Sequence, residues 1–92
     1  MRKKYRSHVG VLLDILRTLN EEGKATISVI IMKANIPYER LKPYLKKLVS
    51  EGYIEVIKES ERKYYVLTPT GVKLLDELEG IKKLFTKLGF PL

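Results

Sequence analysis

The sequence predicts an α+β domain that is mainly α-helical, with three short helices, a two-stranded hairpin and a long final helix. Three observations support this fold class. Apolar residues recur at helical spacing in the first half of the chain, two β-branched and aromatic segments flank a polar turn, and a heptad pattern occupies the last quarter. The 92 residues suffice for one domain, and their hydrophobic and charged shares of 45% and 32% fit a folded chain.

The first helix is expected over residues 7–22, because apolar residues there return every three or four positions. Ser7 is suited to the N-cap, and Gly23 is suited to end the helix. The apolar face consists of Val9, Leu12, Leu13, Leu16 and Leu19. This helix therefore has one side that must be covered by the rest of the domain.

A second helix is expected over residues 27–34, with Thr26 as its cap. Several of its residues are β-branched and only mediocre helix formers, so a strand is the alternative. The helical spacing and the break at residues 35–37 favour the helix. Its inner stripe consists of Ile27, Ile30, Ile31 and Ala34. The segment 25–27 just before it is expected to make a short strand contact.

The third helix follows Pro37, which suits a first helical turn, and ends near Gly52, which suits a left-handed cap. Its core stripe is formed by Leu41, Leu45 and Leu48. Pro43 lies one turn inside the helix and removes one backbone hydrogen bond. We therefore expect a bend or a frayed first turn there.

Residues 53–59 and 63–68 are predicted strands joined by a polar turn at residues 60–62. Thr68 and Pro69 suit the cap and the first position of the last helix. Apolar residues of that helix alternate by four and three positions, as in a coiled-coil heptad. They are Leu74, Leu78, Ile81, Phe85 and Leu88, and we call them the seam.

This order of elements is that of a winged helix-turn-helix, in which the hairpin is the wing, followed by a long additional helix. Accordingly, we expect a basic arm over residues 1–6, a winged helix-turn-helix domain over 7–68 and a dimerisation helix over 69–92. Leu74 and Leu78 of the seam can cover the domain's own core.

The later seam residues extend beyond so small a domain, because twenty helical residues span about 30 Å. Left uncovered, they would form an exposed apolar patch. We therefore predict a homodimer that pairs through the whole seam in a coiled-coil-like manner.

The chain also resembles the small archaeal winged-helix DNA-binding proteins, which include transcriptional regulators and chromatin-like proteins. The segments that resemble this family are RSHVGVLLDIL, MKANIPYERLKPYLKKLVSEGYIE and YYVLTPTGVKLL, so the resemblance spans about residues 5–85. It implies DNA binding and an antiparallel dimer formed by the C-terminal helix. Two prolines depart from the family pattern: Pro37 stands where a capping serine is usual, and Pro43 lies inside the recognition helix.

The outward face of the third helix is the expected DNA-reading surface. In a helix-turn-helix the second helix of the motif enters the major groove, where Arg and Lys can contact guanine or phosphates. The residues expected to contact DNA from this helix are Arg40, Lys42, Pro43, Tyr44, Lys46 and Lys47. An ordinary solvated helix face is the alternative for the lysines, and half-buried packing is the alternative for Tyr44.

The wing and the arm supply the other expected DNA contacts. Lys58, Arg62 and Lys63 flank the tip of the wing, although two nearby glutamates dilute this charge. The net charge is +7, and the arm alone contributes four positive charges through Arg2, Lys3, Lys4 and Arg6. Such arms follow phosphates or enter a minor groove. A solvated turn and an inert tail are the respective alternatives.

Composition argues against several other classes of function. The chain has no cysteine, and His8 is its one histidine, so a metal site is not expected. Nothing pairs a nucleophile with a histidine base, and there is no Gly-rich phosphate loop, so neither an enzyme nor a cofactor is expected. No segment is long and apolar enough to cross a membrane. A cytoplasmic, nucleoid-associated protein is expected.

The sequence thus predicts a homodimeric transcriptional regulator that binds double-stranded DNA sequence-specifically. A chromatin-like architectural protein with little sequence preference is the first alternative. A winged-helix module that docks onto other proteins is the second, and the basic arm and lysine face argue against it. An RNA-binding function is a weaker option, because no aromatic stacking platform is evident.

Overall fold

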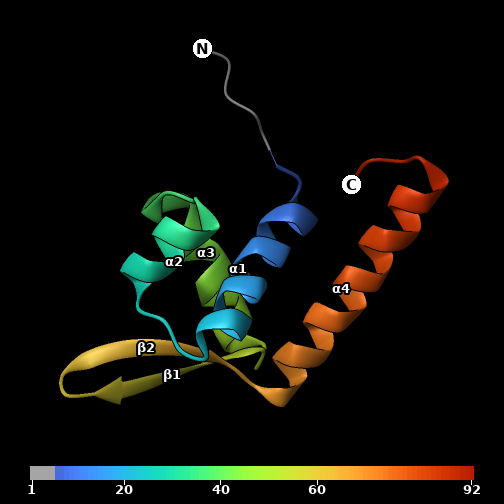
Figure 1. Cartoon of the computed structure of the whole chain (residues 1–92). Helices are drawn as coiled ribbons and strands as arrows, with labels where there is room; N and C mark the ends of the chain where they lie inside the picture. Colours follow the sequence, from blue (N-terminus) through green and yellow to red (C-terminus); the bar gives the residue numbers. More distant parts are fainter. Residues whose placement is uncertain (1–5) are drawn as a thin grey trace, which may run out of the picture.

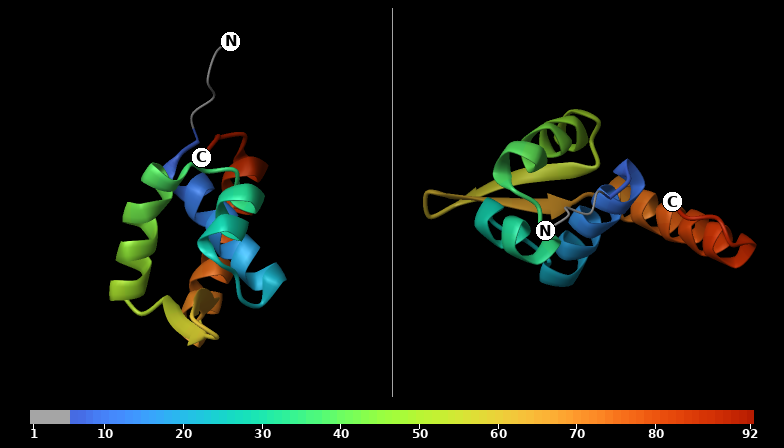
Figure 2. Two further views of the ribbon diagram at one scale, coloured as in Figure 1. Left: turned by 90° about the vertical axis from the view of Figure 1, so that its left-hand side faces the viewer. Right: turned by 90° about the horizontal axis from the view of Figure 1, so that it is seen from above.

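The computed structural model describes residues 6–92 and confirms the predicted fold class (Figure 1). Its elements, in chain order, are α1 (His8–Glu22), α2 (Ile27–Ala34), α3 (Tyr38–Ser50), β1 (Ile54–Glu59), β2 (Arg62–Leu67) and α4 (Pro69–Leu88). The hairpin projects from one side of the helical body, and α4 leaves on the opposite side (Figure 2). The arrangement is a winged helix-turn-helix with a long additional helix.

Helix α1 is the centre of the core because it is covered on two sides. One side packs Val11, Ile15 and Leu19 into a cluster with buried residues of α2, α3 and the hairpin. The other side packs Leu13 and Leu16 against Leu75 of α4. The first turns of α4 therefore belong to the core of the domain, and the predicted boundary at residues 68/69 lies just before a packed segment.

Local capping explains where the first helices begin. The hydroxyl of Ser7 accepts a hydrogen bond from the backbone N–H of Gly10 at 3.0 Å, and that of Thr26 accepts one from Val29 at 3.4 Å. Both predicted caps are thus confirmed. Pro37 is the N-cap residue of α3 and does not lie within its first turn as expected, and within residues 6–92 no side chain caps this helix.

Pro43 lies inside α3, which is a single helix from Tyr38 to Ser50. The N–H that proline lacks would have bonded to the carbonyl of Glu39, one turn earlier. Glu39 is exposed, so water can satisfy that carbonyl at little cost.

The hairpin is a two-stranded antiparallel ribbon joined by a two-residue turn. Ser60 and Glu61 have φ values of 48° and 66°, the left-handed conformations that a tight hairpin turn requires. At the base of the ribbon, Tyr65 exchanges two backbone hydrogen bonds with Ala25, which confirms the predicted strand contact before α2. This contact fixes the hairpin to the helical body.

The start of α4 is held against the chain that enters β1. Thr68 caps the helix by accepting from the N–H of Gly71 at 3.0 Å, and its hydroxyl donates to the carbonyl of Gly52 at 2.6 Å. A Cβ on Gly71 would lie 2.0 Å from the carbonyl oxygen of Tyr53, so only glycine fits there. The LTPTG segment therefore determines the direction in which α4 leaves the domain.

Beyond the core, α4 is exposed along much of its length. Leu74 and Leu78 are half-buried and pack against the cluster around Leu75, as expected for the start of the seam. The exposed fractions of Ile81 and Leu88 are 43% and 57%. The outer half of the helix thus presents apolar side chains to solvent.

Candidate nucleic-acid interface

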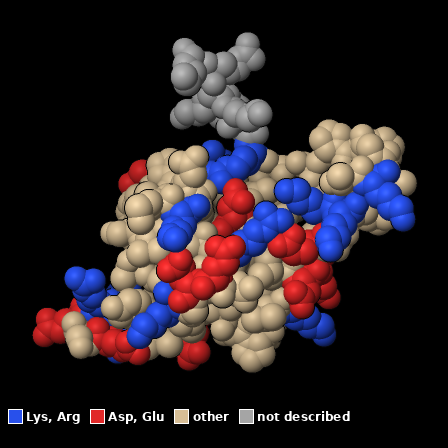
Figure 3. All heavy atoms as spheres, in the orientation of Figure 1, with Lys and Arg blue, Asp and Glu red and all other residues tan. Residues whose placement is uncertain are grey.

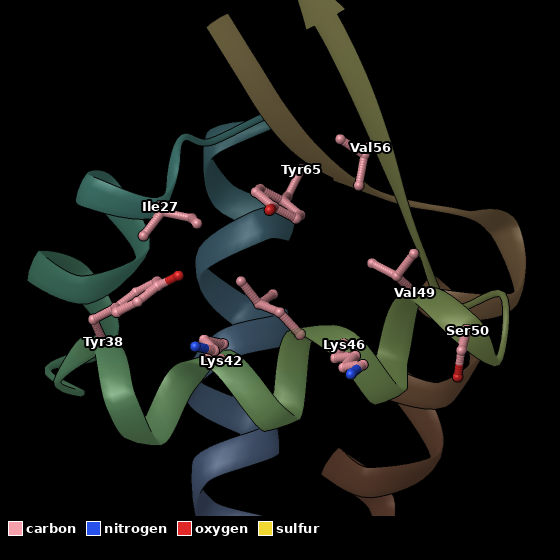
Figure 4. Close-up of a pocket in the computed structure, with 9 residues that line it drawn as sticks. Ile27, Tyr38, Lys42, Lys46, Val49, Ser50, Val56 and Tyr65 are labelled. Carbon is pink, nitrogen blue, oxygen red and sulfur yellow. The ribbon is translucent and has the colours of Figure 1, made fainter.

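Helix α3 directs its cationic residues to two sides. Lys42 and Lys46 line a depression of about 420 Å³ between α3 and the hairpin, together with Tyr38, Val56 and Tyr65 (Figure 4). Arg40, Tyr44 and Lys47 instead line a larger groove of about 930 Å³, and Pro43 also borders this groove. The groove is formed by α1, α3 and the start of α4. We call the first hollow the wing depression and the second the α1–α4 groove.

Two lysines of the hairpin lie on the same face of the ribbon as the wing depression. Val56 pairs with Tyr65 across the two strands, and both residues line the depression. Alternate residues of a strand share a face, so Lys58 and Lys63, which also pair with each other, lie on the depression side as well. Like charges in directly opposed positions repel, so an anion placed between them would be stabilising.

The acidic residues of the hairpin lie apart from these lysines. Glu59 pairs with Arg62 across the ribbon, on the opposite face. The ammonium of Lys24 lies 2.5 Å from a carboxylate oxygen of Glu59 and 4.7 Å from the ring centroid of Tyr64. The hydrogen bond to Glu59 raises the pKa of Lys24. The charge of Glu59 is thus neutralised by Lys24 of the helical body. The ribbon face beside the wing depression keeps the positive charges of its two lysines.

The start of α2 adds a second anion-binding feature beside the wing. A hollow of about 550 Å³ is lined by Thr26 and Ser28 at the N-terminus of α2 and by Arg62 and Lys63 of β2. The first backbone N–H groups of a helix and its dipole both favour a negative group. One phosphate-sized anion could therefore contact α2 and the wing together.

Tyr44 is engaged within the domain. Its hydroxyl lies 2.8 Å from Nδ1 of His8, and the two rings are tilted with their centroids 5.9 Å apart. This contact joins α3 to the start of α1 and turns Tyr44 away from the wing depression.

Arg6 is anchored to the domain. Its guanidinium pairs with Asp14 and also donates to the backbone carbonyls of Ala34 and Asn35, at 2.8 and 2.6 Å. These two carbonyls lie at the end of α2, where a cation is favourable. Arg2, Lys3 and Lys4 lie outside the described residues.

The comparisons with known proteins identify the family. The model of the winged helix-turn-helix family matches residues 5–86. The chain belongs to the winged helix-turn-helix family. Its structure is similar to that of Sso10a-2, a DNA-binding protein from Sulfolobus solfataricus, with 32% sequence identity and a TM-score of 0.82. That match covers 90% of this chain and 85% of Sso10a-2.

A second solved structure is similar in fold alone. It is BpsR of Bordetella bronchiseptica, a protein whose DNA binding is regulated by 6-hydroxynicotinic acid. The TM-score is 0.75 at 16% identity, and the match covers 88% of this chain and 58% of BpsR. A comparison with curated protein sequences gives no significant match.

With the family known, α3 is the second helix of the helix-turn-helix motif and the hairpin is the wing. The sequence pattern pointed to the lysines of both elements, but it did not point to Tyr38, Thr26 and Ser28, which line the hollows beside them. The Tyr38 ring lies 5.6 Å from the ammonium of Lys42, four residues further along α3. That spacing was available in the sequence. The position of Thr26 and Ser28 beside the wing depends on tertiary structure.

The opposite side of the winged-helix domain has a different charge pattern. On the face in Figure 3, acidic side chains gather over the middle of the molecule, and Lys and Arg gather on the outer part of α4.

Within the described residues 6–92, no cluster of three metal-ligating side chains occurs. Nor does any helix in that part of the chain combine the length and hydrophobicity that a membrane span requires.

Proposed function

We propose that this protein binds double-stranded DNA sequence-specifically as a homodimeric transcriptional regulator without enzymatic activity. One observation supports this most directly: two lysines of α3 and two lysines of the wing are directed to the same side of the molecule. Lys42 and Lys46 line the wing depression from α3, and Lys58 and Lys63 lie on the ribbon face that turns toward it. The similarity to Sso10a-2, described as a DNA-binding protein, supports the same proposal.

In this proposal α3 enters the major groove and the wing follows the neighbouring backbone. Lys42 and Lys46 face the bases or the nearest phosphates. On the other flank of α3, Arg40 and Lys47 reach the phosphates, and Pro43 contacts the DNA beside them. Thr26 and Ser28 bind a further phosphate with Arg62 of the wing. The arm at residues 1–6 extends the contact through Arg2, Lys3 and Lys4, whereas Arg6 holds its base to the domain. We place the protein on the nucleoid.

The homodimer is supported by the seam. Residues 69–92 would act as the dimerisation helix and residues 7–68 as the DNA-binding domain. Ile81 and Leu88 of the outer seam are exposed apolar residues, and a coiled-coil-like partner would cover them. A two-fold axis through paired α4 helices would present two recognition helices to two half-sites spaced by one helical turn or a multiple of it.

Fluorescence anisotropy with a labelled duplex, measured over a range of salt concentrations, tests DNA binding. We expect the logarithm of the affinity to fall linearly with the logarithm of the salt concentration. Replacing Lys42 and Lys46 by Ala should weaken binding and make this slope shallower by up to about two phosphate contacts. Lys58→Ala/Lys63→Ala should act in the same way through the wing.

The matched control is Lys33→Ala/Lys73→Ala, which removes two exposed lysines that line no part of the wing depression. It changes the net charge equally but leaves the wing depression intact. Equal losses in all three double variants would mean that DNA responds only to net charge, and the depression would not be the interface. Absence of binding at low salt by a folded sample would instead favour the protein-docking module.

An architectural protein with little sequence preference is a second candidate, and the composition of α3 favours it. The outward face of this helix has Lys and Arg but neither Asn nor Gln, the side chains that read adenine. Lysines often contact phosphates, which position a protein without specifying a sequence. Equal affinity for two unrelated duplexes would support this candidate over the regulator.

A further inference from the structure

The α1–α4 groove lies beside the recognition helix and has an apolar floor to which the proposed function assigns no ligand. Its floor includes Leu12, Leu48 and Leu74, and its rim includes Lys47 and Glu51. Leu74 is also the first residue of the seam. The groove therefore adjoins the start of the seam at Leu74.

A second unexplained apolar surface lies at the other end of α4. Gly89 ends the helix with a φ of 84°, and the N–H of Phe90 donates to the carbonyl of Phe85 at 2.9 Å. Two apolar side chains follow the helix, with exposed fractions of 61% for Phe90 and 39% for Leu92. We call residues 90–92 the tail.

The tail cannot reach the Leu74 end of the groove in its own chain. Leu74 and Gly89 are 15 residues apart on one helix, which corresponds to about 22 Å. Figure 1 shows the tail at the end of α4 that is farthest from the hairpin. The two apolar surfaces can therefore meet there only between two copies of the chain.

The charges along α4 favour an antiparallel arrangement of two such copies. Before the seam centre at Ile81, the helix has three acidic residues and one lysine, whereas after it the helix has lysines alone among its charged residues. The residues before the centre are Lys73, Asp76, Glu77 and Glu79, and those after it are Lys82, Lys83 and Lys87. A parallel pair would place like charges side by side, but an antiparallel pair places the acidic half of one helix beside the basic half of the other. Antiparallel helices also align their dipoles favourably.

An antiparallel seam defines which residues meet. The seam runs from Leu74 to Leu88 and its middle residue is Ile81. If the two copies of Ile81 meet at the two-fold axis, Leu88 of one copy lies beside Leu74 of the other. The tail that follows Leu88 then passes Leu74 and arrives at the apolar floor of the groove.

Resting on the proposed homodimer, we infer that the tail of each chain docks into the α1–α4 groove of its partner, with Phe90 as the main anchor. This contact extends the interface from the seam to the back of the recognition helix. The position of α3 is then supported by the second copy as well as by its own domain. Each DNA-binding surface is thereby completed by the other chain.

Single-cysteine variants test this inference in the full chain, which contains no cysteine of its own. Phe90→Cys is mixed with Glu51→Cys, oxidised and analysed by non-reducing gel electrophoresis and mass spectrometry. Because each chain carries one cysteine, a mixed disulfide reports only contacts between chains. We expect this mixed disulfide to form at least tenfold faster than one between Phe90→Cys and Met32→Cys. Met32 is 69% exposed on α2 and does not line the groove.

Two further variants separate the tail from the dimer. Ile81→Cys alone should form a disulfide with its partner copy, whereas Leu88→Cys alone should not, because antiparallel pairing keeps the two copies of Leu88 apart. Leu92→Cys with Glu51→Cys repeats the tail test while keeping the Phe90 ring.

The outcomes of these cross-linking experiments distinguish the tail contact from the homodimer on which it rests. If Ile81→Cys cross-links but neither tail variant reacts faster with Glu51→Cys than with Met32→Cys, the dimer stands and the tail inference is wrong. Cross-linking of Leu88→Cys to itself would indicate a parallel pair, which also overturns the inference. A monomer in sedimentation velocity, with no disulfide from Ile81→Cys, would overturn both the inference and the proposed homodimer.

Discussion

At the scale of single residues, Gly71 and Gly80 form a matched pair within α4. A methyl group on Gly71 would lie 2.0 Å from the backbone oxygen of Tyr53, which cannot move without shifting the entry to β1. We expect Gly71→Ala to destabilise the fold by about 1–3 kcal/mol, the usual cost of forcing an extra group into a packed site. Thermal unfolding followed by circular dichroism, at matched protein concentration, measures this loss.

Gly80 provides the control because the same substitution there meets open space. Apart from its own helix backbone and chain neighbours, no atom of residues 6–92 lies within 4 Å of the added Cβ. Glycine in a helix interior is less favourable than alanine, so Gly80→Ala should stabilise the fold by about 0.5–1 kcal/mol. Equal destabilisation by both substitutions would show that the contact with Tyr53 is not the cause.

The ion pair between Arg17 and Glu79 predicts a pH dependence of stability. Two nitrogens of Arg17 donate to the two carboxylate oxygens of Glu79, each at 2.6 Å. This hydrogen bonding lowers the pKa of Glu79 below its ordinary value of 4.5 and raises that of Arg17. A carboxyl with a lowered pKa stabilises the fold above its unfolded pKa, and this contribution is lost as the pH falls through the folded pKa.

Arg17→Met should therefore lower the melting temperature at pH 7, and this loss should become smaller as the pH falls below 4.5, the ordinary pKa of Glu79. The side chains are 37% and 34% exposed, so solvent screens the pair and the loss should stay below about 1 kcal/mol. Thermal unfolding at several pH values measures the difference, and Lys73→Met controls for the lost charge. A difference that is equally large at pH 3 would assign the effect to packing of the Arg17 side chain.

At the scale of elements, the helices were predictable because their signals are local. A residue with a hydroxyl group stands just before each of three predicted helices, where its side chain can cap the helix. The capping hydrogen bond is made by Ser7, Thr26 and Thr68 alike. Pro37 was misplaced by one position, because proline fixes φ in a way that suits both the N-cap and the first turn of α3.

The site was only partly predictable, because the direction of a side chain depends on what its element packs against. Periodicity placed the lysines of α3 on the outer face, but it could not show that Lys42 and Lys46 face the wing while Lys47 faces α1. The contacts of Arg6 were likewise invisible, since they join residues 28 and 29 positions apart. Leu75 was overlooked because it lies beside the heptad seam.

The turn of the wing predicts a stabilising substitution. Ser60 and Glu61 both have positive φ, a conformation that side chains with a Cβ adopt at a cost and that Asn and Gly adopt readily. Ser60→Asn/Glu61→Gly should therefore stabilise the fold by about 0.5–2 kcal/mol. Thermal unfolding tests this, with Glu61→Gln as the control for the lost charge. A melting temperature that rises equally in the control would assign the gain to electrostatics.

At the scale of the whole molecule, α4 has two parts with different surroundings. Its first turns complete the core through Leu75, and its outer half extends the seam into solvent. A winged helix alone would end where the core ends. In the proposed homodimer the additional turns pair with a second chain, and the seam can be altered there without disturbing the core.

Ile81→Glu/Leu88→Glu should therefore convert the protein to a folded monomer. Both side chains are exposed in the single chain, so its core and circular dichroism spectrum should be unchanged. Burying two carboxylates in a paired seam is unfavourable, so sedimentation velocity should show loss of the dimer. Affinity for a duplex with two half-sites should fall by on the order of a hundredfold, because the second recognition helix is no longer tethered.

The matched control is Val72→Glu/Thr86→Glu, which adds the same charge to exposed positions of α4 outside the seam. This control should remain dimeric and lose only the small affinity that two added negative charges explain. If the seam variant stays dimeric, the chains must pair through a different surface. If it becomes monomeric but keeps its affinity for both half-sites, one domain suffices for recognition, and the dimer serves another purpose.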